Sequence, residues 1–265
     1  MAQRNFASAL TPSRVDAGGH HFLLGEDWLQ GRSSFGGLQA AMAVVAMRAL
    51  LPADLPLRVL QTTFVGPVPA GELAVSARLL RAGKNVSHVE ARIEVAGETA
   101  CLLVGVFGAA RDSQIALRLA AAPPPKAPDA SFPFPHLPGL TPAFLQHFRM
   151  AWAEGTAPFT GSQATATRIW LQHVEASGNA EADLVALADV IPSPALSMLK
   201  KFAPASSLTW TLELLEPAAP QGEGWWRADT EMHSARDGYV AQTSMLHAPD
   251  HRVVALARQA VVVFG

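Results

Sequence analysis

The chain has few of the residues that build disulfide frameworks or metal sites. Among 265 residues there is one cysteine, Cys101. A disulfide within the chain and a zinc site made of several cysteines are therefore excluded. The nine histidines are spread along the chain and no metal-ligand spacing stands out among them, so we expect no metal. We interpret Cys101, in "ETACLLVGVFG", as a small buried hydrophobic residue of a strand.

Charge is also sparse. Charged residues make up 16% of the chain and the formal net charge is −2. This balance gives no electrostatic reason to bind nucleic acid or an anionic membrane. The first residues lack the apolar region of a secretory signal, and the longest apolar helical segment, "LQAAMAVVAMRALLP", contains Arg48 and is too short to span a bilayer. We expect a soluble, cytoplasmic protein.

Several sequence motifs of enzymes and nucleotide-binding proteins are missing. There is no G-x-S-x-G elbow, which argues against an α/β-hydrolase with a serine nucleophile. There is no Walker A sequence and no G-x-G-x-x-G, so no nucleotide cofactor is implied. We expect the protein to work without a cofactor.

Proline is concentrated in one place. Eight of the 20 prolines fall between Arg111 and Pro142. Because proline lacks a backbone donor and fixes φ, this stretch cannot form a central strand or a long helix. We therefore predict an N-terminal unit at 1–111, a proline-rich linker at 112–142 and a C-terminal unit at 143–265.

The two units share a plan. In the first, "SSFGGLQAAMAVVAMRALLP" is apolar nearly all round and precedes four segments with strand composition. In the second, "LVALADVIPSPALSMLKKF" takes the place of that helix and four strand-like segments follow again. A helix that is apolar on every side must be enclosed, and an antiparallel sheet wrapped around it is a simple enclosure. We predict an α+β fold, a double hotdog of two tandem repeats, each with one long buried helix.

Five segments carry a resemblance to a known family: "FGGLQAAMAVVAMRAL", "LPLRVLQTTFVGPV", "ALADVIPSPAL", "SSLTWTLELLEP" and "DHRVVALARQAVVVFG". Their order over nearly the whole chain resembles the double-hotdog acyl-CoA thioesterases of the thioesterase II (TesB-like) type. The resemblance implies hydrolysis of acyl-CoA to a free acid and CoA, a role in lipid metabolism, and a homodimer or higher homo-oligomer.

The resemblance also implies three site residues. The family holds the attacking water with an Asp, a hydroxyl and a Gln, which match Asp189, Ser207 and Gln259. The best-known members have threonine as the hydroxyl, so Ser206 and Thr209 remain neighbouring candidates. From the residues alone, Asp189 could instead be a helix N-cap, Gln259 a buried amide bonded to backbone, and Ser207 a turn serine.

Because side chains alternate along a strand, the sequence predicts which face of the sheet each of these residues occupies. Gln259 should share an apolar face with Ala257 and Val261. Ser206 and Ser207 should point to opposite faces, and Thr209 should share the face of Ser207.

Two glycines precede the first buried helix. Gly36 and Gly37 either allow close backbone packing or bind the substrate, with a helix-start amide facing the thioester carbonyl.

Two other functions remain open. Double-hotdog hydratases pair an Asp with a His a few residues later on the helix, but "VIPSPALSMLKKF" follows Asp189 without a histidine. A non-catalytic acyl-CoA-binding module is the other alternative.

Overall fold

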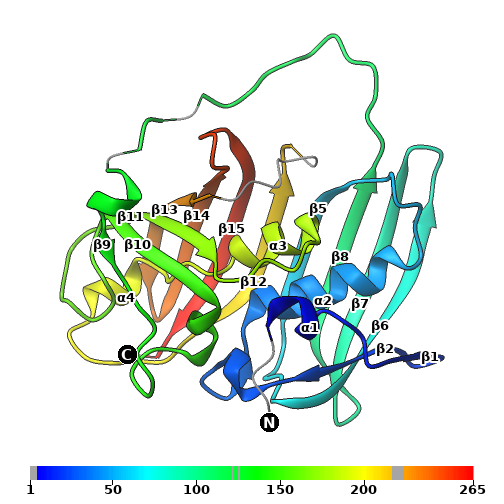
Figure 1. The fold of residues 1–265 in the computed structure, drawn as a ribbon, viewed down its shortest axis with the longest axis horizontal. Helices are drawn as coiled ribbons and strands as arrows, with labels where there is room; N and C mark the ends of the chain where they lie inside the picture. The colour runs from blue at the N-terminus through cyan, green and yellow to red at the C-terminus, as the bar shows by residue number, and fades with distance from the viewer. Residues whose placement is uncertain (1–4, 121, 125, 217–223, 265) are drawn as a thin grey trace.

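A computed structural model describes residues 5–120, 122–124, 126–216 and 224–264. Within them, 13 strands form one antiparallel sheet that curves around the helices, as predicted (Figure 1). From one edge to the other the order is β1 (Arg14–Asp16), β2 (Gly19–Leu24), β6 (Gly71–Ala82), β7 (Val86–Val95), β8 (Glu98–Gly108), β5 (Leu57–Phe64), β12 (Ala205–Leu214), β15 (Val253–Val263), β14 (Tyr239–His247), β13 (Trp226–Arg236), β11 (Ala166–His173), β10 (Phe148–Glu154) and β9 (Phe132–Pro133). The short strands β3 (Leu29–Gln30) and β4 (Ser33–Ser34) pair separately.

The two halves of the sheet join between β5 and β12. These strands run antiparallel, with Gln61 opposite Thr211 and Thr62 opposite Trp210. Because this pairing is continuous with the ladders on both sides, the halves form a single sheet rather than two separate bodies.

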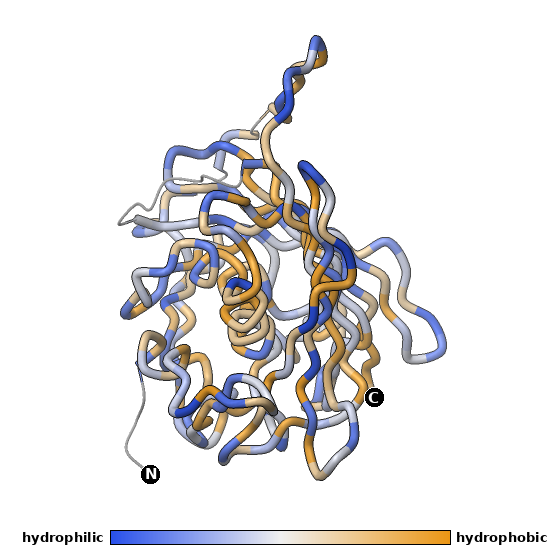
Figure 2. The backbone as a smooth tube through the Cα atoms, turned by 90° about the vertical axis from the view of Figure 1, so that its right-hand side faces the viewer, coloured by the Kyte–Doolittle hydropathy of each residue, from blue (hydrophilic) through white to orange (hydrophobic). Residues whose placement is uncertain are grey.

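The inner face of the sheet is covered by helices. α2 (Gly36–Arg48) is buried along most of its length, because its side chains are apolar on every side. In the second half, α3 (Ala180–Leu187) and the one-turn α4 (Ala195–Met198) replace the single long helix that we predicted. That prediction was wrong because Pro192 and Pro194 cannot continue a helix, so the chain turns after Ala188. Figure 2 shows the helices lying inside the curved sheet.

α2 and α3 lie antiparallel across the boundary between the halves. At one end, the Arg48 guanidinium forms an ion pair with Glu181 in the first turn of α3. At the other end, a side chain on Gly37 would come within 2.9 Å of the Ala186 carbonyl oxygen. The C-terminal end of α3 therefore lies against the N-terminal end of α2.

Shorter helices complete the described structure: α1 (Phe6–Ala9) and the 3₁₀ turns η1 (Glu26–Trp28), η2 (Pro128–Ala130) and η3 (Ala143–His147). None of the helices in the described ranges is both long and apolar enough to span a membrane.

The segment after β8 arches away from the body before it returns to the outside of the second half (Figures 1 and 2). Two side chains hold the returning chain by its carbonyl groups. Arg227 Nη2 donates to the Ala122 carbonyl at 2.9 Å, and Trp170 Nε1 donates to the Lys126 carbonyl at 2.9 Å. Such donors suit a proline-rich segment, whose carbonyls lack the partners that a helix or sheet would supply.

Candidate active site

Asp189 lies where the two halves meet. It follows the C-cap of α3, Ala188, in the turn that the two prolines impose. It does not cap the helix that follows, because α4 begins after Pro194. Its carboxylate instead faces the N-terminus of α2, where the backbone amide of Gly37 bonds to it. Asp189 thus accepts a hydrogen bond from a helix start, but from the helix of the other half.

Gln259 reaches the same carboxylate from the last strand. Its Nε2 donates to Asp189 Oδ1 at 2.6 Å, across 70 residues of sequence. Gln259 lies on the inner face of β15 with Ala257 and Val261, and all three are buried, which confirms the face expected from alternation. Gln259 Oε1 accepts from Gln242 Nε2 at 2.9 Å, and Gln242 lies directly opposite on β14. The side-chain amides of Gln242 and Gln259 therefore form two consecutive hydrogen bonds that end at the Asp189 carboxylate.

Gly36 leaves room for the carboxylate. A side chain at this position would come within 2.7 Å of Asp189 Oδ2 and 2.9 Å of the Phe64 ring. Atoms at such distances overlap, so the close approach of α2 to Asp189 requires a residue without Cβ. We expected Gly36 to allow close packing or to bind the substrate. In the structure, the absence of a side chain at Gly36 leaves space for the Asp189 carboxylate.

The surroundings make Asp189 a weak acid. Burial raises the pKa of its carboxyl from 3.8 to about 7, while the hydrogen bonds from Gln259 and Gly37 lower that pKa and oppose part of the rise. The residue as a whole keeps some exposure to solvent, but the protein atoms around the carboxylate dominate its ionisation. At neutral pH such a group is populated in both forms, which suits a general base.

Ser207 lies on the inner face of β12, and no hydrogen bond joins it to Asp189 or Gln259 among the described residues. It pairs with Val261, two positions along β15 from Gln259. Ser206 is exposed on the outer face, as expected from alternation.

Thr209 does not share the face of Ser207, so that expectation was wrong. A bulge between Ser207 and Thr209 inserts Leu208 without a partner on β15. The extra residue reverses the alternation, and Thr209 pairs with Ala260 and is exposed. Trp210, not Thr209, takes the inner position beside Ser207.

Sequence reasoning missed a polar row across the inner face. Four directly paired residues share this row on adjacent strands: Thr62, Trp210, Gln259 and Gln242. All four are buried. Three buried polar atoms in the row have no partner among the described residues: Thr62 Oγ1, Trp210 Nε1 and Gln242 Oε1. In "GYVAQTSMLHA", Gln242 is two residues from apolar Val240, so strand alternation also predicts an inward-facing amide at Gln242.

Cys101 is close to the site but is not a nucleophile. It is fully buried on β8, as predicted. Burial and then the negative charge of Asp189 raise the pKa of the thiol to about 12. Because the thiolate is the reactive form, this thiol stays inert at neutral pH.

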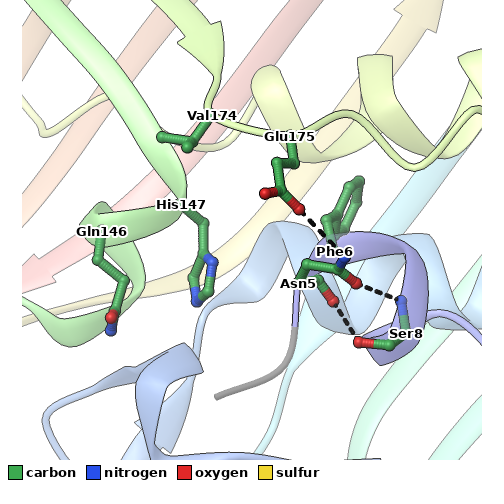
Figure 3. Close-up of a pocket in the computed structure, with 7 residues that line it drawn as sticks. All are labelled: Asn5, Phe6, Ser8, Gln146, His147, Val174 and Glu175. Atoms are coloured by element: carbon green, nitrogen blue, oxygen red, sulfur yellow. Dashed lines mark hydrogen bonds between the residues drawn. The ribbon is translucent and has the colours of Figure 1, made fainter.

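A surface pocket lies elsewhere, between the N-terminal segment and the second half (Figure 3). Its volume is about 480 Å³. Its polar groups already have structural partners: Asn5 caps α1 and donates to Glu175, and His147 stacks on Trp28 with ring centroids 3.8 Å apart. It shares no lining residue with the Asp189 site, so we assign it no part in the chemistry. Among the residues described, no group of three or more His, Cys, Asp or Glu is arranged to hold a metal ion.

Solved structures share this fold over their whole length. A conserved protein of unknown function with a hot dog fold from Alicyclobacillus acidocaldarius has a TM-score of 0.87 and 22% identity, with 100% of this chain and 99% of that chain covered. The acyl-CoA thioesterase II TesB2 from Mycobacterium marinum has a TM-score of 0.75 and 14% identity, with 98% of both chains covered. The dehydratase domain of PpsC from Mycobacterium tuberculosis has a TM-score of 0.56 and 13% identity, with 97% and 99% covered. At these identities the likeness establishes the fold alone, since one fold hosts several chemistries.

Family models identify the chain more specifically. No curated protein matches it. Residues 24–108 match the model of the acyl-CoA thioesterase N-terminal domain, and residues 120–263 match that of the acyl-CoA thioesterase C-terminal domain. The two models follow each other in the order of the two halves and together cover most of the chain, so the protein belongs to the acyl-CoA thioesterase family.

Proposed function

We propose that the protein hydrolyses acyl-CoA thioesters to a free acid and CoA, with Asp189 as general base. The observation that carries the proposal is the contact between Asp189 and Gln259. A carboxyl whose pKa is raised to about 7 meets a side-chain amide from another element, and both lie at a helix N-terminus between the two halves. A perturbed carboxyl with such partners is typical of a catalytic base.

The proposed reaction is a direct attack by water. Ionised Asp189 takes a proton from the water, whose oxygen bonds to the thioester carbonyl carbon. The tetrahedral intermediate then collapses, the carbon–sulfur bond breaks, and the proton leaves with the CoA sulfur. Gln259 and Ser207 would hold the water, because an amide and a hydroxyl can each donate and accept.

The N-terminus of α2 would stabilise the developing oxyanion. Backbone amides and the helix dipole favour negative charge at this end of a helix. The Gly37 amide already bonds to Asp189, so we assign the carbonyl oxygen to the adjacent Gly36 amide. No covalent acyl-enzyme is needed, since the buried thiol of Cys101 is too weak an acid to supply a nucleophile.

The pH dependence of turnover tests this proposal. Because only the ionised carboxylate can accept a proton, kcat/KM should rise about tenfold per pH unit below a midpoint near pH 7, then level off. The measurement is the loss of thioester ultraviolet absorbance with a series of acyl-CoAs, which works over a wide pH range.

Two results would contradict the proposal. Tight acyl-CoA binding without release of CoA would favour the acyl-binding module. Hydration of an enoyl-CoA with the thioester intact would favour the hydratase.

The role proposed for Ser207 predicts a difference between two adjacent serines. Ser207→Ala should lower kcat by roughly tenfold or more, because the inner hydroxyl would no longer hold the water. Ser206→Ala is the matched control and should leave kcat unchanged, since Ser206 is exposed on the outer face. Both variants should be assayed at pH 8, where Asp189 is mostly ionised. Equal rates for both variants and the wild type would remove Ser207 from the mechanism.

A further inference from the structure

Gln259 can help Asp189 only in one of two orientations. A primary amide that is rotated by 180° about its last bond exchanges its donor NH₂ for its acceptor oxygen at almost no change in shape. In the structure Nε2 faces the carboxylate at 2.6 Å. In the reversed orientation, two oxygens would face each other and the ionised carboxylate would lose a donor.

Gln242 favours the same orientation from the other end of the Gln259 amide. Its Nε2 donates to Gln259 Oε1 at 2.9 Å, and both side chains are buried. If Gln259 reversed, two NH₂ groups would meet at this contact and two oxygens would meet at Asp189. Both ends of the Gln259 amide therefore favour the same orientation.

We propose that Gln242 is a positioning residue, which holds the Gln259 amide in the orientation that donates to Asp189. This inference rests on the function proposed above only for its catalytic consequence. The orientation itself follows from the hydrogen bonds.

The packing of Gln242 supports a role beyond stability. Its Oε1 is buried without a partner among the described residues. An unsatisfied buried acceptor is destabilising, so the oxygen of this amide does not contribute to stability. The favourable half of the Gln242 amide is the half that points at Gln259.

Gln242→Met tests the proposal, because methionine is similar in length and carries no amide. The variant should fold with a stability close to that of the wild type, because it removes the unpaired Gln242 Oε1 but leaves Gln259 Oε1 without its donor, while kcat falls roughly tenfold. The midpoint of its kcat/KM profile should move upward by about one pH unit, since a reversible Gln259 amide no longer stabilises the carboxylate form. Should Gln242→Met fail to fold, Gln242→Leu provides the same test with a different shape.

Ser244→Ala is the matched control. Ser244 lies two residues along β14, also buried, and bonds to Thr230 on β13 at 2.9 Å rather than to the site. Its removal should leave the midpoint of the profile unchanged.

A second measurement separates failure of this inference from failure of the proposed function. The pKa of Asp189 can be measured without activity, from the pH dependence of unfolding free energy in proteins with and without Asp189→Asn. Gln242→Met should raise that pKa even if no acyl-CoA is hydrolysed. If the wild type hydrolyses acyl-CoA but Gln242→Met keeps both its pKa and its kcat within twofold, the positioning role is wrong and the thioesterase proposal stands.

Discussion

Asp189→Asn should reduce kcat by about 10²–10⁴-fold, the range expected when a general base is lost. Asparagine has nearly the same shape and can still accept from Gln259, but it cannot take a proton from water. The remaining activity should lose its dependence on pH near 7, because the group that titrates there is gone. Initial rates between pH 5 and 9 measure both effects.

The same variant should become more stable relative to the wild type as pH rises. The carboxyl of folded Asp189 has a pKa of about 7, above its ordinary value of 3.8, so between these values the folded state binds more protons than the unfolded state. Wild-type stability contributed by this group is therefore lost as pH rises through 7. Asparagine does not ionise, so above that pH it avoids a cost of roughly a few kcal/mol.

Asp183→Asn is the control for both effects. Asp183 is also an aspartate of the α3 segment, but its carboxylate accepts from the Ser177 amide and hydroxyl at 2.9 and 2.6 Å. Its replacement should lower the unfolding free energy and spare kcat. An Asp189→Asn protein that keeps more than half of the wild-type rate, with an unchanged circular dichroism spectrum, would leave Asp189 with a structural role only.

Gln259→Leu should lower kcat by about two orders of magnitude, as expected for the loss of one water-positioning contact. Leucine keeps the apolar volume but leaves the Gln242 amide and the Asp189 carboxylate without their shared partner, so the free energy of unfolding should also fall, by about 1–3 kcal/mol. Thermal unfolding and kcat are the two measurements. The activity that remains should appear at higher pH, because the carboxylate has lost one of the hydrogen bonds that lower its pKa.

Val261→Ala is the control, which should lose a similar amount of stability without a loss of turnover. Val261 is a buried neighbour on the same face of β15 and packs against Ala195 and Val240. Its truncation should cost about 1–3 kcal/mol of stability and leave kcat close to that of the wild type. A Gln259→Leu protein as active as the wild type would discard the proposed role of the amide.

The hydrophobic pattern of the sequence predicted burial correctly in β15 and α2. Side chains in the segment 253–263 alternate between buried and less buried, because successive residues of a strand point to opposite faces of the sheet. The inner position of Gln259 could therefore be predicted. α2 could be predicted as a buried helix because it is apolar on every side. Both features depend on neighbouring residues only.

Alternation failed at β12, where one residue is added. The bulge at Leu208 lies in the ladder between β12 and β15, whereas the pairing of β12 with β5 runs from Thr209 to Glu213 without a shift. No local pattern in "SSLTWTLELLEP" marks it. The exposed position of Thr209 was therefore not predictable from the segment itself.

The sequence by itself determined the α+β class, the repeated plan and the residue types of the candidate site. Only the tertiary structure decided which groups meet. The antiparallel packing of α2 and α3 brings Asp189 to the Gly37 amide, and the ladder between β14 and β15 places Gln242 behind Gln259. The physical reason is that a pKa of about 7 arises from desolvation and hydrogen bonds supplied by elements from both halves, and a segment read alone contains neither.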